Sequence, residues 1–243
     1  MSGATEPVPI PSPAPRRGWL LPVPADRRPR RFAQLLVGLL VYGLTMAMMV
    51  RAVLGLDPWD VFHQGLTEWV NRWVPLSFGA IITIVSVAVL LLWIPLRQRP
   101  GVGTVANVAI IGAATDLGLF LFPATESWPA RIAYLVAGIA GNALAGALYI
   151  GAGLGPGARD GLMTGLVARG VGSVRLVRTS IEITVLAVGF VLGGTVGVGT
   201  VLYAVSIGPL LHVLLPLCRI DPAVVPTVPP SNVVDPADCR PNG

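Results

Sequence analysis

The sequence predicts an all-α, polytopic membrane protein with six transmembrane helices, two short re-entrant or interfacial helices, and inverted 3+3 repeats. Three observations support this prediction: an apolar composition, regularly spaced apolar segments, and an internal repeat. Of 243 residues, 53% are hydrophobic and only 12% are charged, whereas a soluble domain carries about 25% charged residues. With a mean hydropathy of +0.74, the chain lacks the polar surface of a soluble globule, and lipid must cover it.

The predicted elements follow one another without a long soluble insertion. Six apolar segments are each long enough to cross about 30 Å of hydrocarbon. They span residues 32–54, 76–96, 102–122, 131–152, 175–195 and 199–218. Segments 58–72 and 157–171 are shorter and mixed in polarity. Asp57-Pro58 lies at the start of the first segment, and Gly155-Pro156-Gly157 lies at the start of the second. These two segments are therefore predicted as the short helices.

The domain organisation is a single transmembrane domain between two tails. Residues 1–31 hold eight of the 23 prolines, and residues 220–243 hold six more. Such Pro-rich composition favours disordered tails, here 1–31 and 219–243, on both sides of a domain at 32–218. Within it, repeat one covers 32–122 and repeat two covers 131–218.

The arginines predict the orientation. All 17 basic residues are arginines, and with a cytoplasmic N-terminus 14 of them fall on the inner side. The outer side keeps only Arg51, Arg72 and Arg131. Cytoplasmic loops of membrane proteins are enriched in Arg and Lys, so both termini are predicted to be cytoplasmic.

The repeat is visible as a recurring motif. Gly101-Val-Gly-Thr-Val105 returns as Gly197-Val-Gly-Thr-Val201, and Asp60 with its following Gly-Leu pair returns at Asp160. Each half carries three spans. Because three is odd, the second half must enter the membrane from the opposite side, as in inverted-repeat transporters.

The repeat also pairs two ionisable residues, Asp116 in the third span and His212 in the sixth. A charged Asp at a span centre costs roughly 2.5–3.5 kcal/mol on insertion scales, and the sequence shows no local partner for Asp116. Both residues are candidates for substrate binding near the midplane, and their protonation is a candidate for coupling. A neutral Asp or a packed His is the alternative.

Further candidates lie near the short helices and within the spans. Asp60, Arg159 and Asp160 sit where free backbone N–H groups favour an anion or polar substrate, and are predicted to form outer and inner vestibules. A solvated interfacial turn is the alternative. Asn107 and Asn142 either contact substrate or hydrogen-bond across helices. The predicted structural ion pair, four residues apart on one helix, joins Arg178 and Glu182.

Several function classes are not expected. Cys218 and Cys239 have no metal-ligand spacing, and the chain has no P-loop Lys, HExxH or GxSxG motif. No cofactor, metal site or enzymatic activity is therefore predicted. Nucleic acid is not an expected partner, because the arginines flank apolar segments rather than forming one basic and aromatic patch.

The motifs resemble those of a known family. The segments that carry the resemblance are Leu54–Asp60, Gly101–Thr104 leading to Asp116, Gly153–Asp160, and Gly197–Thr200 leading to Pro209. Together they resemble the bacterial YczE/YyaS/YitT-like integral membrane proteins over residues 32–218. The resemblance implies a multi-pass protein of the bacterial cytoplasmic membrane and leaves the activity open.

The functional prediction is a small transporter or permease-like protein, whose partners are the lipid bilayer and a small polar or ionic substrate. A channel is one alternative, because inverted repeats with short helices also build pores. A membrane scaffold or accessory subunit for an enzyme or assembly is the other. The sequence does not predict the oligomeric state.

Overall fold

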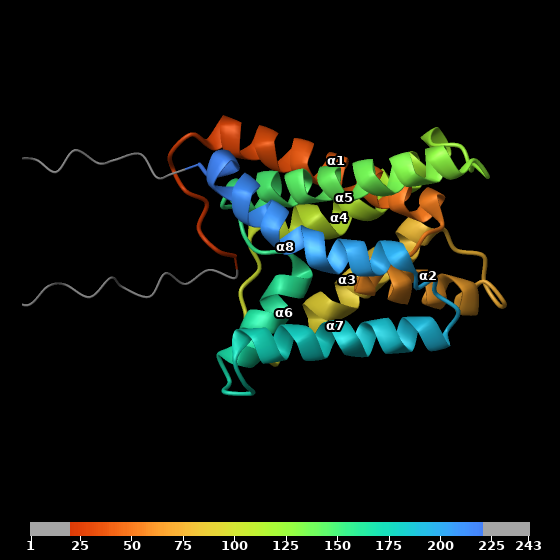
Figure 1. Ribbon diagram of the computed structural model, residues 1–243. Coiled ribbons are helices and arrows are strands. Elements are labelled where there is room, and N and C mark those ends of the chain that lie inside the picture. The colour runs from red at the N-terminus through yellow and green to blue at the C-terminus, as the bar shows by residue number, and fades with distance from the viewer. Residues whose placement is uncertain (1–19, 221–243) are drawn as a thin grey trace, which may run out of the picture.

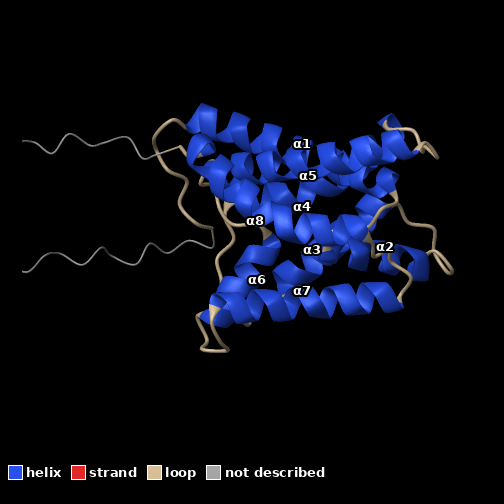
Figure 2. Cartoon of the chain, in the orientation of Figure 1, coloured by secondary structure: helices blue, strands red, loops and turns tan. Residues whose placement is uncertain are grey.

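The computed structural model describes residues 20–220 (Figure 1). This part of the chain forms eight α-helices and no strands (Figure 2), which confirms the all-α prediction. The helices are α1 Arg28–Ala52, α2 Pro58–Val70, α3 Phe78–Leu91, α4 Val102–Leu121, α5 Trp128–Gly151, α6 Ala158–Val167, α7 Val174–Val191 and α8 Val198–Cys218. The predicted tails lie mostly outside the described residues, although α1 already begins at Arg28.

Four helices, α1, α4, α5 and α8, are long and apolar enough to cross a membrane. Helix α3 is apolar but has only 14 residues. Helix α7 has 18 residues and carries Arg175, Arg178 and Glu182. The predicted spans 76–96 and 175–195 are therefore longer than the helices that form there.

Local chemistry explains both shorter helices. Beyond Leu91 the chain continues in turns, because Pro95 lacks a backbone N–H and disfavours helical geometry in the preceding residue. Here Trp93 turns inward, is 2% exposed, and donates from Nε1 to the Ala158 carbonyl at 3.0 Å. Helix α7 ends before Gly193, whose φ of 105° takes the chain out of helical geometry.

Helix α1 packs closely against both α4 and α5. Small residues allow close backbone approach: Gly38 lies against the Tyr149 backbone, Gly43 against Ala114, and Gly138 of α5 against Met49. Between helices in lipid, such van der Waals contact replaces the hydrophobic effect as a source of stability. A larger side chain at these glycines would separate the central helices.

Each short helix packs against a helix of the other half of the chain. In α2, a Cβ on Gly65 would lie 2.3 Å from the Gly189 carbonyl oxygen of α7. In α6, a Cβ on Gly161 would lie 1.9 Å from the Trp93 ring beyond α3. Figure 1 shows α2 and α6 toward opposite ends of the bundle. The two halves are thus interleaved rather than side by side.

Two equivalent junctions join the halves. The Gly199 N–H at the start of α8 donates to the Leu54 carbonyl after α1 at 2.7 Å. Likewise, the Gly103 N–H at the start of α4 donates to the Leu154 carbonyl after α5 at 2.8 Å. The residue after each accepting carbonyl is a glycine with a positive φ, which is 111° at Gly55 and 129° at Gly155. The repeated motif therefore makes the same contact twice.

The two described ends of the chain lie at the same end of the bundle (Figure 1). Arg31, which is 3% exposed, holds them together. It pairs with Asp26 at 2.6 Å and donates to the carbonyls of Ala152 at 2.9 Å and Ile220 at 3.2 Å. A planar guanidinium with several donors suits this set of three acceptors.

The two halves differ in how closely their last two helices approach. In repeat one, a Cβ on Gly112 of α4 would lie 2.3 Å from the Gly79 carbonyl oxygen of α3. The corresponding Gly208 of α8 has no atom within 4 Å of such a Cβ. Helix α7 buries only Val177 and Gly189. The second half is therefore more loosely packed around α7 and α8.

Candidate functional site: a charged cavity between the helices

A cavity of about 200 Å³ lies where all eight helices converge, and residues of each helix line it. A cavity between the helices of a bundle is a common place for a ligand site. Its wall combines aromatic and apolar side chains with ionisable groups. The polar residues that the helices contribute include Tyr42, Asn107, Tyr149, Arg159, Asp160 and Tyr203.

A pair of buried carboxylates forms one side of the site. Asp57, 2% exposed, caps the N-terminus of α2, because its Oδ1 accepts from the backbone N–H groups of Trp59 at 2.9 Å and Asp60 at 3.2 Å. Asp60 is fully buried, and its Oδ1 lies 3.1 Å from His63 Nδ1. The remaining Oδ2 atom of each carboxylate is buried without a hydrogen-bond partner.

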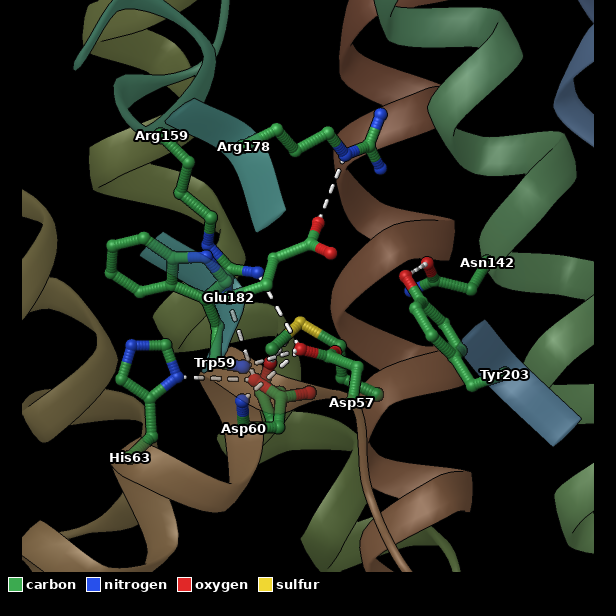
Figure 3. Close-up of polar contacts among 11 residues, drawn as sticks. Asp57, Trp59, Asp60, His63, Asn142, Arg159, Arg178, Glu182 and Tyr203 are labelled. Atoms are coloured by element: carbon green, nitrogen blue, oxygen red, sulfur yellow. Dashed lines mark hydrogen bonds and ion pairs between the residues drawn. The ribbon is translucent and has the colours of Figure 1, made fainter. Parts of the chain in front are cut away.

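A single guanidinium from α6 faces both carboxylates (Figure 3). Arg159 Nη1 lies 3.7 Å from Asp57 Oδ1, and Nη2 lies 3.8 Å from Asp60 Oδ1. The same guanidinium stacks over the Trp59 ring at 4.9 Å from the ring centroid. The prediction that Asp60 and Arg159 belong to separate vestibules is therefore wrong, because the folding of α2 and α6 brings them into one site.

The other charged groups of the wall have partners of their own. Arg178 Nε donates to Glu182 Oε1 at 2.9 Å within α7, and both side chains are partly exposed. Asp160 Oδ2 accepts from the Tyr149 hydroxyl at 3.0 Å. The cavity thus presents three carboxylates and two guanidiniums at its wall, with Asp60 directly behind it.

The two asparagines have different positions. Asn107 lines the cavity. Asn142 is 1% exposed and does not line it, but its Oδ1 accepts from the hydroxyl of the cavity residue Tyr203 at 3.0 Å. Asn142 therefore orients the cavity residue Tyr203 without lining the cavity itself, and its Nδ2 is buried without a hydrogen-bond partner.

Asp116 and His212 lie outside this cavity, and the fold does not bring them together. Asp116 accepts from Ser77 Oγ at 2.6 Å and from the Gly79 N–H at 2.8 Å, which ties α4 to the start of α3. Asp116 therefore has hydrogen-bond partners that lie 37 and 39 residues away in the sequence, and the sequence did not reveal them. His212 lies on an exposed face of α8.

Sequence reasoning missed most aromatic residues of the site. Three of the four tyrosines in the chain, Tyr42, Tyr149 and Tyr203, line the cavity. Tyr42 lies near the middle of a predicted span, away from the membrane interface where Tyr is usually enriched, and this was the available signal. Tyr149 and Tyr203 lie near the ends of predicted spans, where a tyrosine is expected at the interface, so no local signal marked them. His63 was detectable from its three-residue spacing to Asp60, which places both on one helix face.

Within residues 20–220, no group of three or more His, Cys, Asp or Glu side chains is arranged to hold a metal ion. The side chains that line the cavity can bind and ion-pair with a polar solute, and its carboxylates can exchange protons.

Comparison with known proteins identifies relatives along the whole described core. Residues 29–216 match the family described as "Family of unknown function (DUF6198)". An uncharacterized protein of Haemophilus influenzae is 37% identical over 204 residues, covering 83% of this chain and 90% of the relative. No solved structure matches.

Two relatives come from Bacillus subtilis. The uncharacterized membrane protein YczE is 31% identical over 189 residues, which cover 76% of this chain and 83% of YczE. The uncharacterized protein YyaS is 26% identical over 187 residues, with coverage of 74% and 90%. The family match and these relatives confirm the resemblance predicted from the sequence, and the printed description of YczE as a membrane protein agrees with the apolar helices. The chain therefore belongs to this YczE-like family of membrane proteins.

Proposed function

We propose that the protein is a small transporter that carries a small polar or ionic solute through the central cavity. The observation that supports this most directly is the cavity of about 200 Å³, lined by residues of all eight helices and by five charged side chains. Ionisable residues inside a membrane protein are costly and mark functional pathways by default.

We further propose that six helices cross the membrane and that the two halves are inverted copies. The equivalent junctions support this, because Gly103 contacts Leu154 as Gly199 contacts Leu54. The positions of α2 and α6 toward opposite ends of the bundle also support it (Figure 1). In transporters of this architecture, short or broken helices from the two repeats meet at the substrate site.

The difference between the halves suggests how access changes. The α3 and α4 helices meet closely at Gly79 and Gly112, whereas Gly208 of α8 faces open space. In an inverted-repeat transporter, one half rocks against the other around a fixed site. The proposed movement brings α7 toward α8 while α3 and α4 separate, which exposes the cavity to the other side.

The orientation is also part of the proposal. The end of the bundle that holds the start of α1 and the end of α8 also holds the α3–α4 and α6–α7 connections, which carry Arg97 and Arg169 (Figure 1). The end of α1, which carries Arg51, and the start of α5, which carries Arg131, lie at the opposite end. The positive-inside rule assigns the arginine-rich end to the cytoplasm. Both ends of the chain are therefore proposed to be cytoplasmic, in the membrane of a bacterial cell.

A reconstituted system tests the transport function. The full-length protein is placed in phosphatidylethanolamine and phosphatidylglycerol liposomes, which are incubated with a small-molecule extract of bacterial cytosol. Mass spectrometry then compares solutes retained by these liposomes and by protein-free liposomes. We expect at least one small polar solute to accumulate with a rate that saturates with concentration.

A matched pair of variants on α3 ties the flux to the cavity. Ser86 lines the cavity, whereas Ala88 is exposed on the outer face of the same helix. Ser86→Phe is expected to abolish the accumulation, and Ala88→Phe is expected to retain it. Equal flux in both variants, or no solute distinguishing protein from protein-free liposomes, would contradict transport through this cavity. A flux that never saturates would favour a channel.

A further inference from the structure

The charges around Asp57 and Asp60 do not balance. Within residues 20–220, the only cation within 4.0 Å of either carboxylate, apart from the ring of His63, is Arg159. Two ionised carboxylates beside one guanidinium leave one negative charge inside the protein. Burying an uncompensated charge is far more costly than burying a paired one, so the pair requires one further positive charge.

The other groups facing this pair do not supply that charge. From α2, His63 Nδ1 lies 3.1 Å from Asp60 Oδ1, but burial of the ring, together with the nearby Arg159 charge, lowers the pKa of His63 to about 3, so the imidazole is neutral. From α7, Arg178 is engaged by Glu182. The helices α1 and α8 contribute the phenols of Tyr42 and Tyr203, and α6 adds another carboxylate, Asp160, which accepts from the Tyr149 hydroxyl.

The buried oxygens indicate the size of the missing cation. Asp57 Oδ2 and Asp60 Oδ2 are sealed from solvent and have no hydrogen-bond partner. A metal ion such as Ca²⁺ requires about six to eight oxygen ligands at roughly 2.3–2.6 Å, and within residues 20–220 no group of three or more His, Cys, Asp or Glu side chains is placed to hold one. A proton needs no additional space. Both carboxylates face the one guanidinium through their Oδ1 atoms, which leaves the two Oδ2 atoms to accept the proton.

We infer that Asp57 and Asp60 together bind one exchangeable proton, which couples the proposed transport to the proton gradient. This inference rests on the proposed function for its coupling step, although proton binding itself does not. A hydronium ion in the cavity transfers its proton to the Oδ2 of one of the two carboxylates and leaves as water. Its release restores the second carboxylate, and no electrons are transferred.

The geometry connects this proton to the cavity and to α6. Asp57 lines the cavity, so a proton reaches the pair from the same space as the solute. Arg159 belongs to α6, whereas both carboxylates precede or belong to α2. A shift of α6 relative to α2 moves the guanidinium toward or away from the pair, which releases or admits the proton.

Infrared spectroscopy tests proton binding without any solute. The full-length protein in lipid is titrated with acid, and the carbonyl band of protonated carboxyl groups is followed in H₂O and D₂O. We expect a D₂O-sensitive band that is lost in Asp57→Asn, which keeps an N-capping side chain. Asp116→Asn, at a carboxylate outside the cavity, is the control and should retain the band.

The outcomes separate proton binding from transport. Absence of the band in the wild-type protein, or its persistence in both Asp57→Asn and Asp60→Asn, overturns proton binding at this pair. A sodium-dependent rise in thermal stability without the band assigns the site to a metal cation and also overturns it.

Coupling is tested in the same liposomes, supplied with the cytosol extract under an inward proton gradient. We expect the gradient to increase solute accumulation in the wild-type protein and to have no effect in Asp57→Asn. If solute accumulation by the wild-type protein is the same with and without the proton gradient, the coupling is overturned but the transport function is not. A band without accumulation of any solute overturns the transport function and retains the proton site.

Discussion

The Arg159 guanidinium of α6 lies 3.8 Å from the Asp60 carboxylate of α2, so the two short helices meet in one ionic contact. Each helix begins after a turn at a different end of the bundle (Figure 1). This contact joins residues that are far apart in the sequence, and among residues 20–220 Arg159 is the one arginine that lies within 4.0 Å of the buried carboxylates. Stability and the proposed function both depend on it.

Removing this cation should destabilise the protein. Arg159→Gln leaves two buried carboxylates without compensation, and we expect a loss of roughly 1–3 kcal/mol. That is less than the roughly 3–5 kcal/mol of a fully buried pair, because the Arg159 side chain is 31% exposed and water screens it. Thermal unfolding in detergent, followed by tryptophan fluorescence, measures the change.

Two further variants make this test specific. Arg178→Gln, at an arginine whose side chain is 59% exposed, should change the unfolding temperature little. Adding Asp57→Asn to Arg159→Gln removes one of the unbalanced charges while retaining the cap, and should restore part of the stability. A double variant less stable than Arg159→Gln would contradict the electrostatic explanation.

The junction glycines should not tolerate a side chain. A Cβ on Gly55 would lie 2.6 Å from the Gly197 backbone nitrogen, and a Cβ on Gly155 would lie 2.8 Å from Gly101 Cα. Both glycines also have positive φ. We expect Gly55→Ala and Gly155→Ala each to cost more than about 1 kcal/mol, measured by the same unfolding assay.

A variant at a third glycine separates the cost of backbone strain from the cost of the steric clash. Gly170 has a φ of 76°, but no atom lies within 4 Å of a Cβ built there. Gly170→Ala therefore reports the backbone strain without the clash, and should be less destabilising than either junction variant. Equal losses at all three positions would show that the close approach of the halves contributes nothing.

Asp116 and His212 should behave differently from each other, although the repeat aligns them. Asp116→Ala removes an acceptor of two hydrogen bonds at the start of α3, and we expect a loss of roughly 1–2 kcal/mol. His212→Ala changes an exposed side chain and should leave the unfolding temperature within error. A larger effect at His212 would indicate a partner that covers this face of α8.

Reporter fusions should reveal the proposed topology. A phosphatase that is active only outside the cytoplasm is fused after Phe122, between α4 and α5, or after Gly170, between α6 and α7. Activity is expected after Phe122 and not after Gly170, and a cytoplasmic fluorescent reporter should give the reverse. Activity of the phosphatase at both positions would be incompatible with the proposed spans.

The sequence predicted the number, order and approximate bounds of the helices because hydrophobicity and Gly-Pro turns are local signals. It also predicted the short helices, since Asp57-Pro58 is a local N-terminal signal. It misjudged the end of α3, where Trp93 reads as an interfacial residue but packs beneath Gly161. Only tertiary packing determines that inward rotation.

The site was predicted in part. Asp60, Arg159, Asp160 and Asn107 were named from their position and charge, but their convergence depends on α2 and α6 crossing between the halves. Asp116 drew attention because it is an acid in an apolar span. Its partners at the start of α3 lie far away in the sequence, so no local pattern reveals that its charge is already satisfied.

The two junctions have a consequence for biogenesis. When α1 to α4 have left the ribosome, the Leu54 carbonyl and the Gly103 N–H still lack partners, because both partners belong to the second half. The first half therefore remains an incomplete insertion intermediate until α5 to α8 arrive. Two half-chains, cut between α4 and α5 and produced together, should assemble by exchanging these bonds, whereas either half alone should be degraded.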